Sequence, residues 1–212
     1  MIVRSHAEGI EGGRDMRQHA PNRARRNRGF SLVELIVVVG IMFIVVAMAI
    51  INIRSALPSI RANAGLNQVV AQFRFGREAA LAQRRNIQLT FPAGAIQNQI
   101  ALTRLDVVGT TTVGTTQIST IVLENQLQFT TFAGVPDTPD GFGNNGAIDF
   151  GGTVTLLFMS DGTFVDAAGN PLNGTVRFGV PGNANTARAV TILGATGRIR
   201  GYRWNGSTWL EQ

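Results

Sequence analysis

The sequence from Gly29 to Ile53 is G-F-S-L-V-E-L-I-V-V-V-G-I-M-F-I-V-V-A-M-A-I-I-N-I, and the rest of the chain is organised around it. It contains 17 consecutive residues without a polar side chain, from Leu35 to Ile51. A helix over residues 30–53 would be about 36 Å long, which is enough to cross a hydrocarbon core of roughly 30 Å. The stretch therefore predicts a membrane-spanning helix.

One carboxylate, Glu34, stands just before the apolar run. A charge inside a membrane helix costs roughly 2.5–3.5 kcal/mol on insertion scales and usually has a partner. If the chain is cut between Gly29 and Phe30, the new α-amine lies four residues before this carboxylate. The amine of a neighbouring helix, shifted along its axis, would then neutralise it. The stretch thus predicts self-assembly as well as anchoring.

These residues resemble the type IV prepilin signature, which is Gly, then Phe, then Glu at the fifth mature position, followed by an unbroken apolar run. Gly29, Phe30 and Glu34 match it residue by residue. The resemblance implies cleavage after Gly29 by a prepilin peptidase and N-methylation of Phe30. It also implies assembly with other pilins or pseudopilins, on an inner-membrane assembly platform, into a pilus or pseudopilus.

Three simpler interpretations compete with this resemblance. An uncleaved signal-anchor would give Glu34 no special role, and a helix in a protein core would not need so long an unbroken apolar run. Ala47-Met48-Ala49 has the form of a secretory signal-peptide cleavage site. Against that interpretation, the apolar run is long and the Gly-Phe-x-x-x-Glu pattern would be coincidental.

Residues 1–29 form a basic leader. All 19 basic residues of the chain are arginines, and seven of them, against three acids, lie in this leader. Positive charge before the span predicts that this end stays in the cytoplasm and that the C-terminal domain is periplasmic. We therefore expect a single-pass protein of the bacterial inner membrane, with translation starting at Met1 or Met16.

The pattern after the apolar run predicts an α+β fold. Apolar residues recur at helical spacing to about Arg85, and from Asn86 onward short alternating runs are separated by Gly, Asn, Asp and Pro. Residues 109–120 are rich in Thr and predict a loop or weak hairpin, and residues 134–146 predict a long loop. We expect a cleaved leader (1–29), a transmembrane and assembly helix (30–53), its amphipathic continuation (54–85) and a periplasmic antiparallel β-domain (86–212).

Several function classes are disfavoured by composition. The chain has no Cys, and both histidines lie in the leader, so the mature chain lacks Cys/His zinc sites, Cys nucleophiles and Ser-His-Asp triads. We therefore expect neither an enzyme nor a cofactor. The aspartates of the C-terminal half lack a recognisable calcium spacing, and turn chemistry accounts for Asp140-Gly141 and Asp161-Gly162.

Three features resemble minor pseudopilins of the GspH/FimT type. They are the segment F-M-S-D-G-T-F at 158–164, Gly197-Arg198-Ile199-Arg200, and Trp209 near the end. This resemblance implies a type IV pilin-like fold in which two antiparallel sheets pack beside the long helix.

The C-terminal stretch is a candidate DNA-binding site. Residues 167–210 contain no acid but carry five arginines. In a strand Arg198, Arg200 and Tyr202 share one face, where guanidinium groups can grip phosphates and the ring can stack on a base. In some FimT-type relatives a Gly-Arg-x-Arg segment binds DNA during natural transformation. The matching residues and their expected neighbours are Gly197, Arg198, Arg200, Arg188 and Arg203.

The same arginines also have a structural interpretation. Arg198 or Arg200 would then pair with Glu124, with Asp106 or with the next subunit. The sequence thus favours a minor pilin or pseudopilin of a type II secretion pseudopilus or type IV pilus. The alternative is a minor pilin that binds DNA through Arg198 and Arg200 during DNA uptake.

Overall fold

The computed structural model describes residues 29–92, 98–108 and 111–212, with the backbone alone at 51–55. Its first element is one helix, α1 (Leu32–Gln83), which contains Pro58. The chain divides into two compact units between Val46 and Ala47. Each unit is described below by itself.

The first unit contains the start of α1. The backbone N–H of Leu35 donates to the carbonyl of Ser31 at 3.1 Å and closes the first turn. Residues Leu32–Ile50 form a helix long and apolar enough to cross a membrane, and none of them is buried among the residues that the structure describes. An apolar surface of this extent calls for lipid or neighbouring subunits around it.

The second unit contains two sheets in which every pairing is antiparallel. Sheet A has the order β3-β2-β1-β6-β7, with β1 (Ile87–Thr90), β2 (Gln99–Val108), β3 (Thr111–Val122), β6 (Leu156–Phe158) and β7 (Phe164–Val165). Sheet B has the order β11-β10-β9-β8-β4, with β4 (Gln128–Phe129), β8 (Gly174–Gly179), β9 (Arg188–Leu193), β10 (Arg198–Trp204) and β11 (Trp209–Glu211). A short strand, β5 (Ile148–Asp149), also pairs with β8, and a 3-10 turn (Ala184–Thr186) precedes β9.

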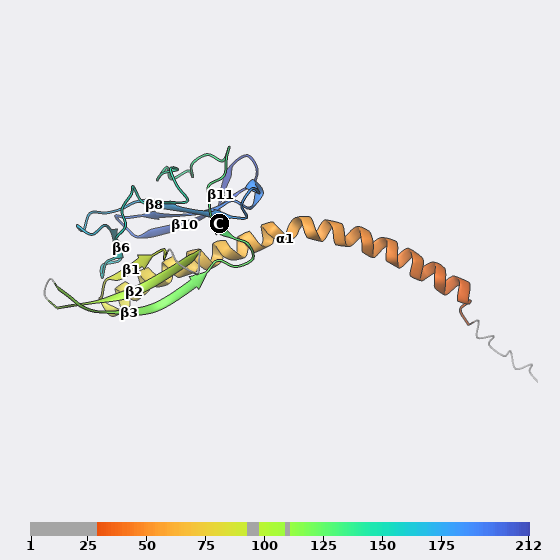
Figure 1. Ribbon diagram of the computed structural model, residues 1–212, viewed down its shortest axis with the longest axis horizontal. Helices are drawn as coiled ribbons and strands as arrows, with labels where there is room; N and C mark the ends of the chain where they lie inside the picture. Colours follow the sequence, from red (N-terminus) through yellow and green to blue (C-terminus); the bar gives the residue numbers. More distant parts are fainter. Residues whose placement is uncertain (1–28, 93–97, 109–110) are drawn as a thin grey trace, which may run out of the picture. The chain divides into compact units, whose positions relative to one another are not determined.

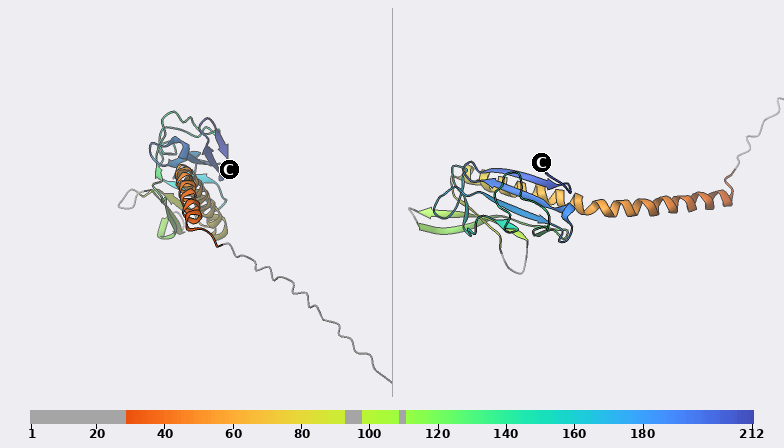
Figure 2. Two further views of the ribbon diagram at one scale, coloured as in Figure 1. Left: turned by 90° about the vertical axis from the view of Figure 1, so that its right-hand side faces the viewer. Right: turned by 90° about the horizontal axis from the view of Figure 1, so that it is seen from above.

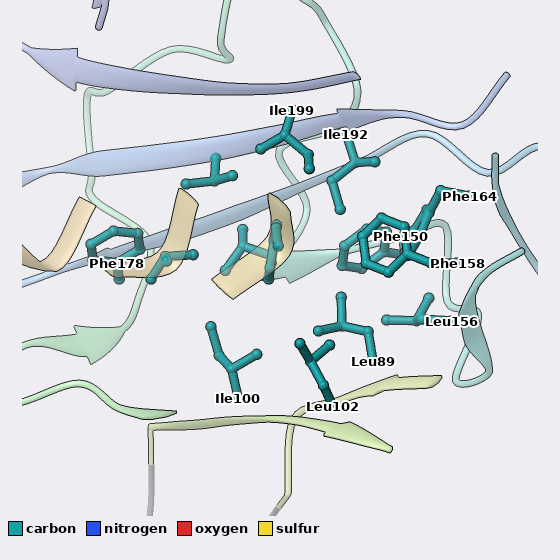
Figure 3. Close-up of a cluster of buried hydrophobic side chains, with 14 of the residues drawn as sticks. Leu89, Ile100, Leu102, Phe150, Leu156, Phe158, Phe164, Phe178, Ile192 and Ile199 are labelled. Carbon is teal, nitrogen blue, oxygen red and sulfur yellow. The ribbon is translucent and has the colours of Figure 1, made fainter. Parts of the chain in front are cut away.

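The second half of α1 lies between the two sheets (Figures 1 and 2). Its residues Leu66, Val69 and Phe73 are at most 1% exposed and belong to the main core. Figure 3 shows Leu89 and Ile100 of sheet A on one side of the helix and Ile192 of sheet B on the other. The α+β fold class, with a long N-terminal helix packed on an antiparallel β-domain, is confirmed.

Gly76 shows how closely α1 approaches sheet A. A Cβ atom at this position would lie 3.0 Å from Cδ2 of Leu102 and 3.2 Å from Cδ2 of Phe158. A larger residue here would have to displace one of these two buried side chains. The glycine therefore permits a close helix–sheet contact and interrupts the apolar stripe of the helix.

One prediction at the level of elements is corrected. The Thr-rich segment expected to be a loop or weak hairpin belongs largely to β3, a 12-residue strand that pairs along the whole of β2. The β-branched Thr side chains favour extended backbone, and pairing with β2 supplies the hydrogen bonds that fix it. The turn at Ser160-Asp161-Gly162 is confirmed, since Phe158 pairs with Phe164 across it.

The long loop at 134–146 covers the face of sheet B that points away from α1. A second apolar cluster lies there and contains Tyr202, Trp204 and Trp209, with Val135 of the loop packed against it. The indole N–H of Trp209 donates to the carbonyl of Pro136 at 2.9 Å. This loop is irregular, as predicted, but it is fixed to the sheet.

Candidate functional site

The residues of the predicted processing and assembly site lie together at the start of α1. Gly29, Phe30, Ser31 and Glu34 line one shallow, open hollow, and all four are exposed. Glu34 stands in the first turn, where the helix dipole favours a negative charge. Within the described residues no cation lies at ion-pair distance from this carboxylate.

The predicted DNA-binding residues fall on two faces of sheet B. Arg198, Arg200 and Tyr202 share the face of β10 that points away from α1, as strand alternation predicts. Ile199 points into the main core, and Gly201 lies against Leu66 of the helix. The two arginines are partly exposed, with side-chain exposures of 47% for Arg198 and 30% for Arg200.

Arg200 is held by carboxylates of its own chain. Its Nη1 lies 3.0 Å from Oδ1 of Asp140, and its Nε lies 3.1 Å from Oε1 of Glu211. The pKa of Arg200 is raised, first by its hydrogen bond with Tyr202 and then by these two carboxylates. Its charge is therefore already balanced within the chain.

Asp140 is the centre of this arrangement. Its Oδ2 accepts hydrogen bonds from Thr191 at 2.6 Å and Tyr202 at 2.9 Å, while Arg200 donates to Oδ1. Burial raises the pKa of Tyr202, whose side chain lies under the loop at 134–146 and presents no open ring face for a base. Asp140 thus fixes the loop to β9 and β10.

The ion pairs expected for Arg198 and Arg200 are corrected by this geometry. The partner of Arg200 is neither Glu124 nor Asp106, and Asp106 pairs instead with Arg104 at 3.0 Å. Asp140 is 60 residues away from Arg200 in the sequence and reaches it only because the long loop folds back over sheet B. The carboxylate of Asp140 binds an arginine, whereas turn chemistry had been expected.

Arg188 lies on the opposite face of sheet B and is completely buried. All five N–H groups of a guanidinium can find acceptors here: Nε donates to Asn63, Nη1 to the carbonyls of Asn185 and Ala187, and Nη2 to the carbonyl and hydroxyl of Ser59. Burial, followed by the charge of nearby Arg203, lowers the pKa of Arg188 to about 10. Arg188 therefore ties β9 to α1 and does not share a surface with Arg198.

Arg203 is the register partner of Arg188 and lies on the same, helix-facing side of sheet B. Its side chain is half-buried, and its Nε is buried without a hydrogen-bond partner in the described part of the chain. The structure thus brings Arg198 and Arg200 together and separates both from Arg188 and Arg203.

Gly197 has a structural role next to these arginines. Its φ is +61°, a conformation that favours glycine, and a Cβ there would lie 2.0 Å from the carbonyl oxygen of Gly162 and 2.8 Å from Nε of Arg77. The same Nε donates to that carbonyl at 3.1 Å. Because it lacks a side chain, Gly197 allows its turn to pack against the turn at Gly162 and against the side chain of Arg77.

Sequence reasoning missed a cleft beside Gly197. The cleft has a volume of about 560 Å³ and lies between α1 and the turn that joins β9 to β10. Arg74 and Arg77 of the helix and Arg198 of β10 line it, together with Glu78. No local signal in the sequence places the helical arginines beside Arg198.

The acids of the C-terminal half make internal contacts. Asp137 pairs with the buried Arg177, whose pKa is lowered by burial and partly restored by that carboxylate. Asp161 accepts from the backbone of Thr163 at 2.9 Å, as turn chemistry predicts. Among the described residues no group of three or more His, Cys, Asp or Glu side chains is placed to hold a metal ion.

The start of the chain matches a known family model. Residues 24–50 match the prokaryotic N-terminal methylation motif, which includes Gly29, Phe30 and Glu34. The chain is type IV prepilin-like. The match covers the leader end and the apolar helix and does not extend into the β-domain.

The prepilin-like chain also resembles solved structures of minor pilins. It is similar to the type IV minor pilin FimU of Pseudomonas aeruginosa, with 16% identity and a TM-score of 0.42 over 66% of this chain and 90% of that one. A second crystal form of FimU gives 14% identity and a TM-score of 0.44 over 70% and 91%. The chain is also similar to the minor pseudopilin EpsH of the Vibrio cholerae type 2 secretion system, with 13% identity and a TM-score of 0.43. This match covers 68% of this chain and 97% of EpsH. No curated protein matches the chain.

Proposed function

We propose that this protein is a structural subunit, a minor pilin or pseudopilin, of a type II secretion pseudopilus or type IV pilus. The observation that carries the proposal is the methylation motif at residues 24–50, which includes an apolar helix with no buried residue in the described part of the chain. A helix of this kind is stable only in lipid or against other apolar helices. A subunit that moves from a membrane into a filament meets both conditions.

Processing is part of this proposal. Prepilin peptidase cleaves between Gly29 and Phe30, and the new amine of Phe30 is methylated. The leader stays in the cytoplasm and the β-domain reaches the periplasm, which the seven leader arginines favour. Mass spectrometry of the protein isolated from membranes tests this step: we expect an N-terminal peptide that begins with N-methylated Phe30. A mature chain that begins after Ala49 would point to an ordinary signal peptide instead.

Assembly depends on Glu34 in this proposal. Its exposed carboxylate neutralises the amine of Phe30 on a neighbouring subunit. We expect Glu34→Val to leave cleavage and membrane insertion unchanged and to reduce the amount of the protein in purified filaments. Glu34→Gln, which keeps the side-chain shape but lacks the charge, should behave in the same way, and Ser31→Ala in the same turn serves as the control. Normal incorporation of both Glu34 variants would disprove the pairing.

A second candidate function is DNA binding during uptake. The observation that favours it is the exposure of Arg198, which lines the same cleft as Arg74 and Arg77. The test is a titration with double-stranded DNA at two salt concentrations, comparing the wild-type protein with Arg198→Gln. A log–log salt slope of about −2 to −3, corresponding to two or three phosphates and lost in the variant, would support it. No binding by the folded protein at low salt would exclude it.

A further inference from the structure

We infer that the cleft lined by Arg74, Arg77 and Arg198 binds a carboxylate-bearing segment of a neighbouring filament subunit. This inference rests on the proposed function and adds a contact surface to it. The cleft is rich in arginine, and the roles proposed for Gly29, Phe30 and Glu34 do not account for it. It is called the arginine cleft below.

The first argument is an excess of positive charge. Three arginines and one glutamate, Glu78, line the arginine cleft. Neither Arg74 nor Arg77 forms an ion pair with any described residue, and the nearest carboxylate to Arg198 is Asp140, with Nη2 and Oδ1 4.0 Å apart. The arginines of the lining outnumber its one carboxylate, so an anion that enters the cleft is favoured.

The second argument is the way in which the guanidinium groups are positioned. Arg74 and Arg77 are three residues apart on α1 and therefore lie on neighbouring turns of the same helix face. The Nε of Arg77 is held by its hydrogen bond to the carbonyl of Gly162 at 3.1 Å. A planar guanidinium presents paired N–H groups that match the two oxygens of a carboxylate.

The third argument concerns the size and composition of the arginine cleft. A volume of about 560 Å³ accommodates a few side chains, and Leu193 and Ile199 supply an apolar part of the lining. An acidic side chain with adjacent aliphatic atoms fits such a mixed surface.

A nucleic acid fits it less well. A phosphate backbone would bring several negative charges close to Glu78 in the cleft and to Asp140, which lies 4.0 Å from Arg198. A single carboxylate meets far less of this repulsion. The local charges thus favour a protein segment over a polyanion.

The test is site-specific photocrosslinking of the full-length protein in its native cells. A photoreactive side chain at Thr196, which is exposed and lines the arginine cleft, should form an adduct with another subunit. Peptide mapping of the adduct should identify a segment that contains Asp, Glu or a C-terminal carboxylate. The same group at the exposed Thr208, between β10 and β11, should not give this adduct.

Charge reversal decides whether the arginines cause the contact. We expect Arg74→Glu to reduce the adduct by about tenfold or more, because it removes an attractive charge and adds a repulsive one. Arg84→Glu, an exposed arginine outside the cleft, is the matched control and should leave the adduct unchanged.

Several outcomes would overturn the inference. They are an adduct with DNA, an adduct that survives Arg74→Glu, and the absence of an adduct in filaments that contain the protein. If the protein is absent from filaments altogether, the proposed function fails, and the inference fails with it. Measuring the filament content separately from the adduct distinguishes these two failures.

Discussion

At the scale of single residues, burial gives the arginines of the C-terminal third different tasks. Arg188 is fully buried and hydrogen-bonded to neutral acceptors, Arg200 is paired with two carboxylates, and Arg198 is half exposed at the rim of the arginine cleft. These three residues carry the same chemical group within a span of 13 positions. Their environments, rather than their identity, decide which of them is available to a ligand.

The first prediction concerns Arg188. Replacing it with Ala removes its hydrogen bonds to Asn63 and Ser59 and a buried side chain that joins β9 to α1. We expect Arg188→Ala to lower the free energy of unfolding by about 2–4 kcal/mol. Chemical denaturation of the purified protein measures this change.

Arg84→Ala is the control for this prediction. Arg84 is exposed, and we expect its substitution to change stability by no more than about 0.5 kcal/mol. Equal stabilities of the Arg188 and Arg84 variants would contradict the structural role of the buried arginine.

At the scale of elements, the second half of α1 is the central layer of the β-domain. Its buried side chains contact both sheets. Apolar residues must therefore recur at helical spacing on the two sides of the helix that face the sheets. Phe73 is completely buried, whereas Phe75, two residues further along, is 44% exposed. Residues two positions apart on a helix point in different directions, so the two rings distinguish the buried from the exposed face.

The second prediction uses this pair of residues. We expect Phe73→Ala to destabilise the protein by about 3–5 kcal/mol, because it removes a buried ring and leaves a cavity between the sheets. Phe75→Ala should cost much less, since a large part of its ring is already in contact with solvent. Thermal or chemical unfolding of the two variants measures the difference. Similar losses would contradict the burial of Phe73 and the exposure of Phe75.

At the scale of the whole molecule, the two compact units differ in how their apolar residues are buried. No residue of the apolar helix Leu32–Ile50 is buried among the described residues, whereas the second unit contains its own core, with members from Ala62 to Ile199. The buried core residues described in the second unit all follow the apolar helix in the sequence.

The third prediction follows from this division. A protein that begins at Ser59 keeps the acceptors for Arg188 and all the buried helix residues, and it lacks the exposed apolar run. We expect it to be soluble without detergent and to unfold in one cooperative thermal transition, followed by circular dichroism. A broad, non-cooperative transition would show that residues before Ser59 contribute to the core. The full-length protein should require detergent or lipid under the same conditions.

Much of this architecture follows from local patterns. The apolar run, the position of Glu34, the helical stripe through Leu66 and Phe73, and the Ser160-Asp161-Gly162 turn each depend on neighbours in the sequence. The Thr-rich strand β3 was less predictable, because β2 supplies its hydrogen bonds. A strand at the edge of a sheet is stabilised by pairing, which composition reports only weakly.

The sequence by itself determined the anchor, the prepilin-like N-terminus and the α+β class, because each depends on the spacing of residue types within about one helix or strand. Only the tertiary structure decided which arginines are accessible. Asp140 reaches Arg200 across 60 residues, and Ser59 reaches Arg188 across 129. The free energy of a charged side chain depends on the groups that surround it in space, and those groups come together only when the loop at 134–146 and the helix close on the two faces of sheet B.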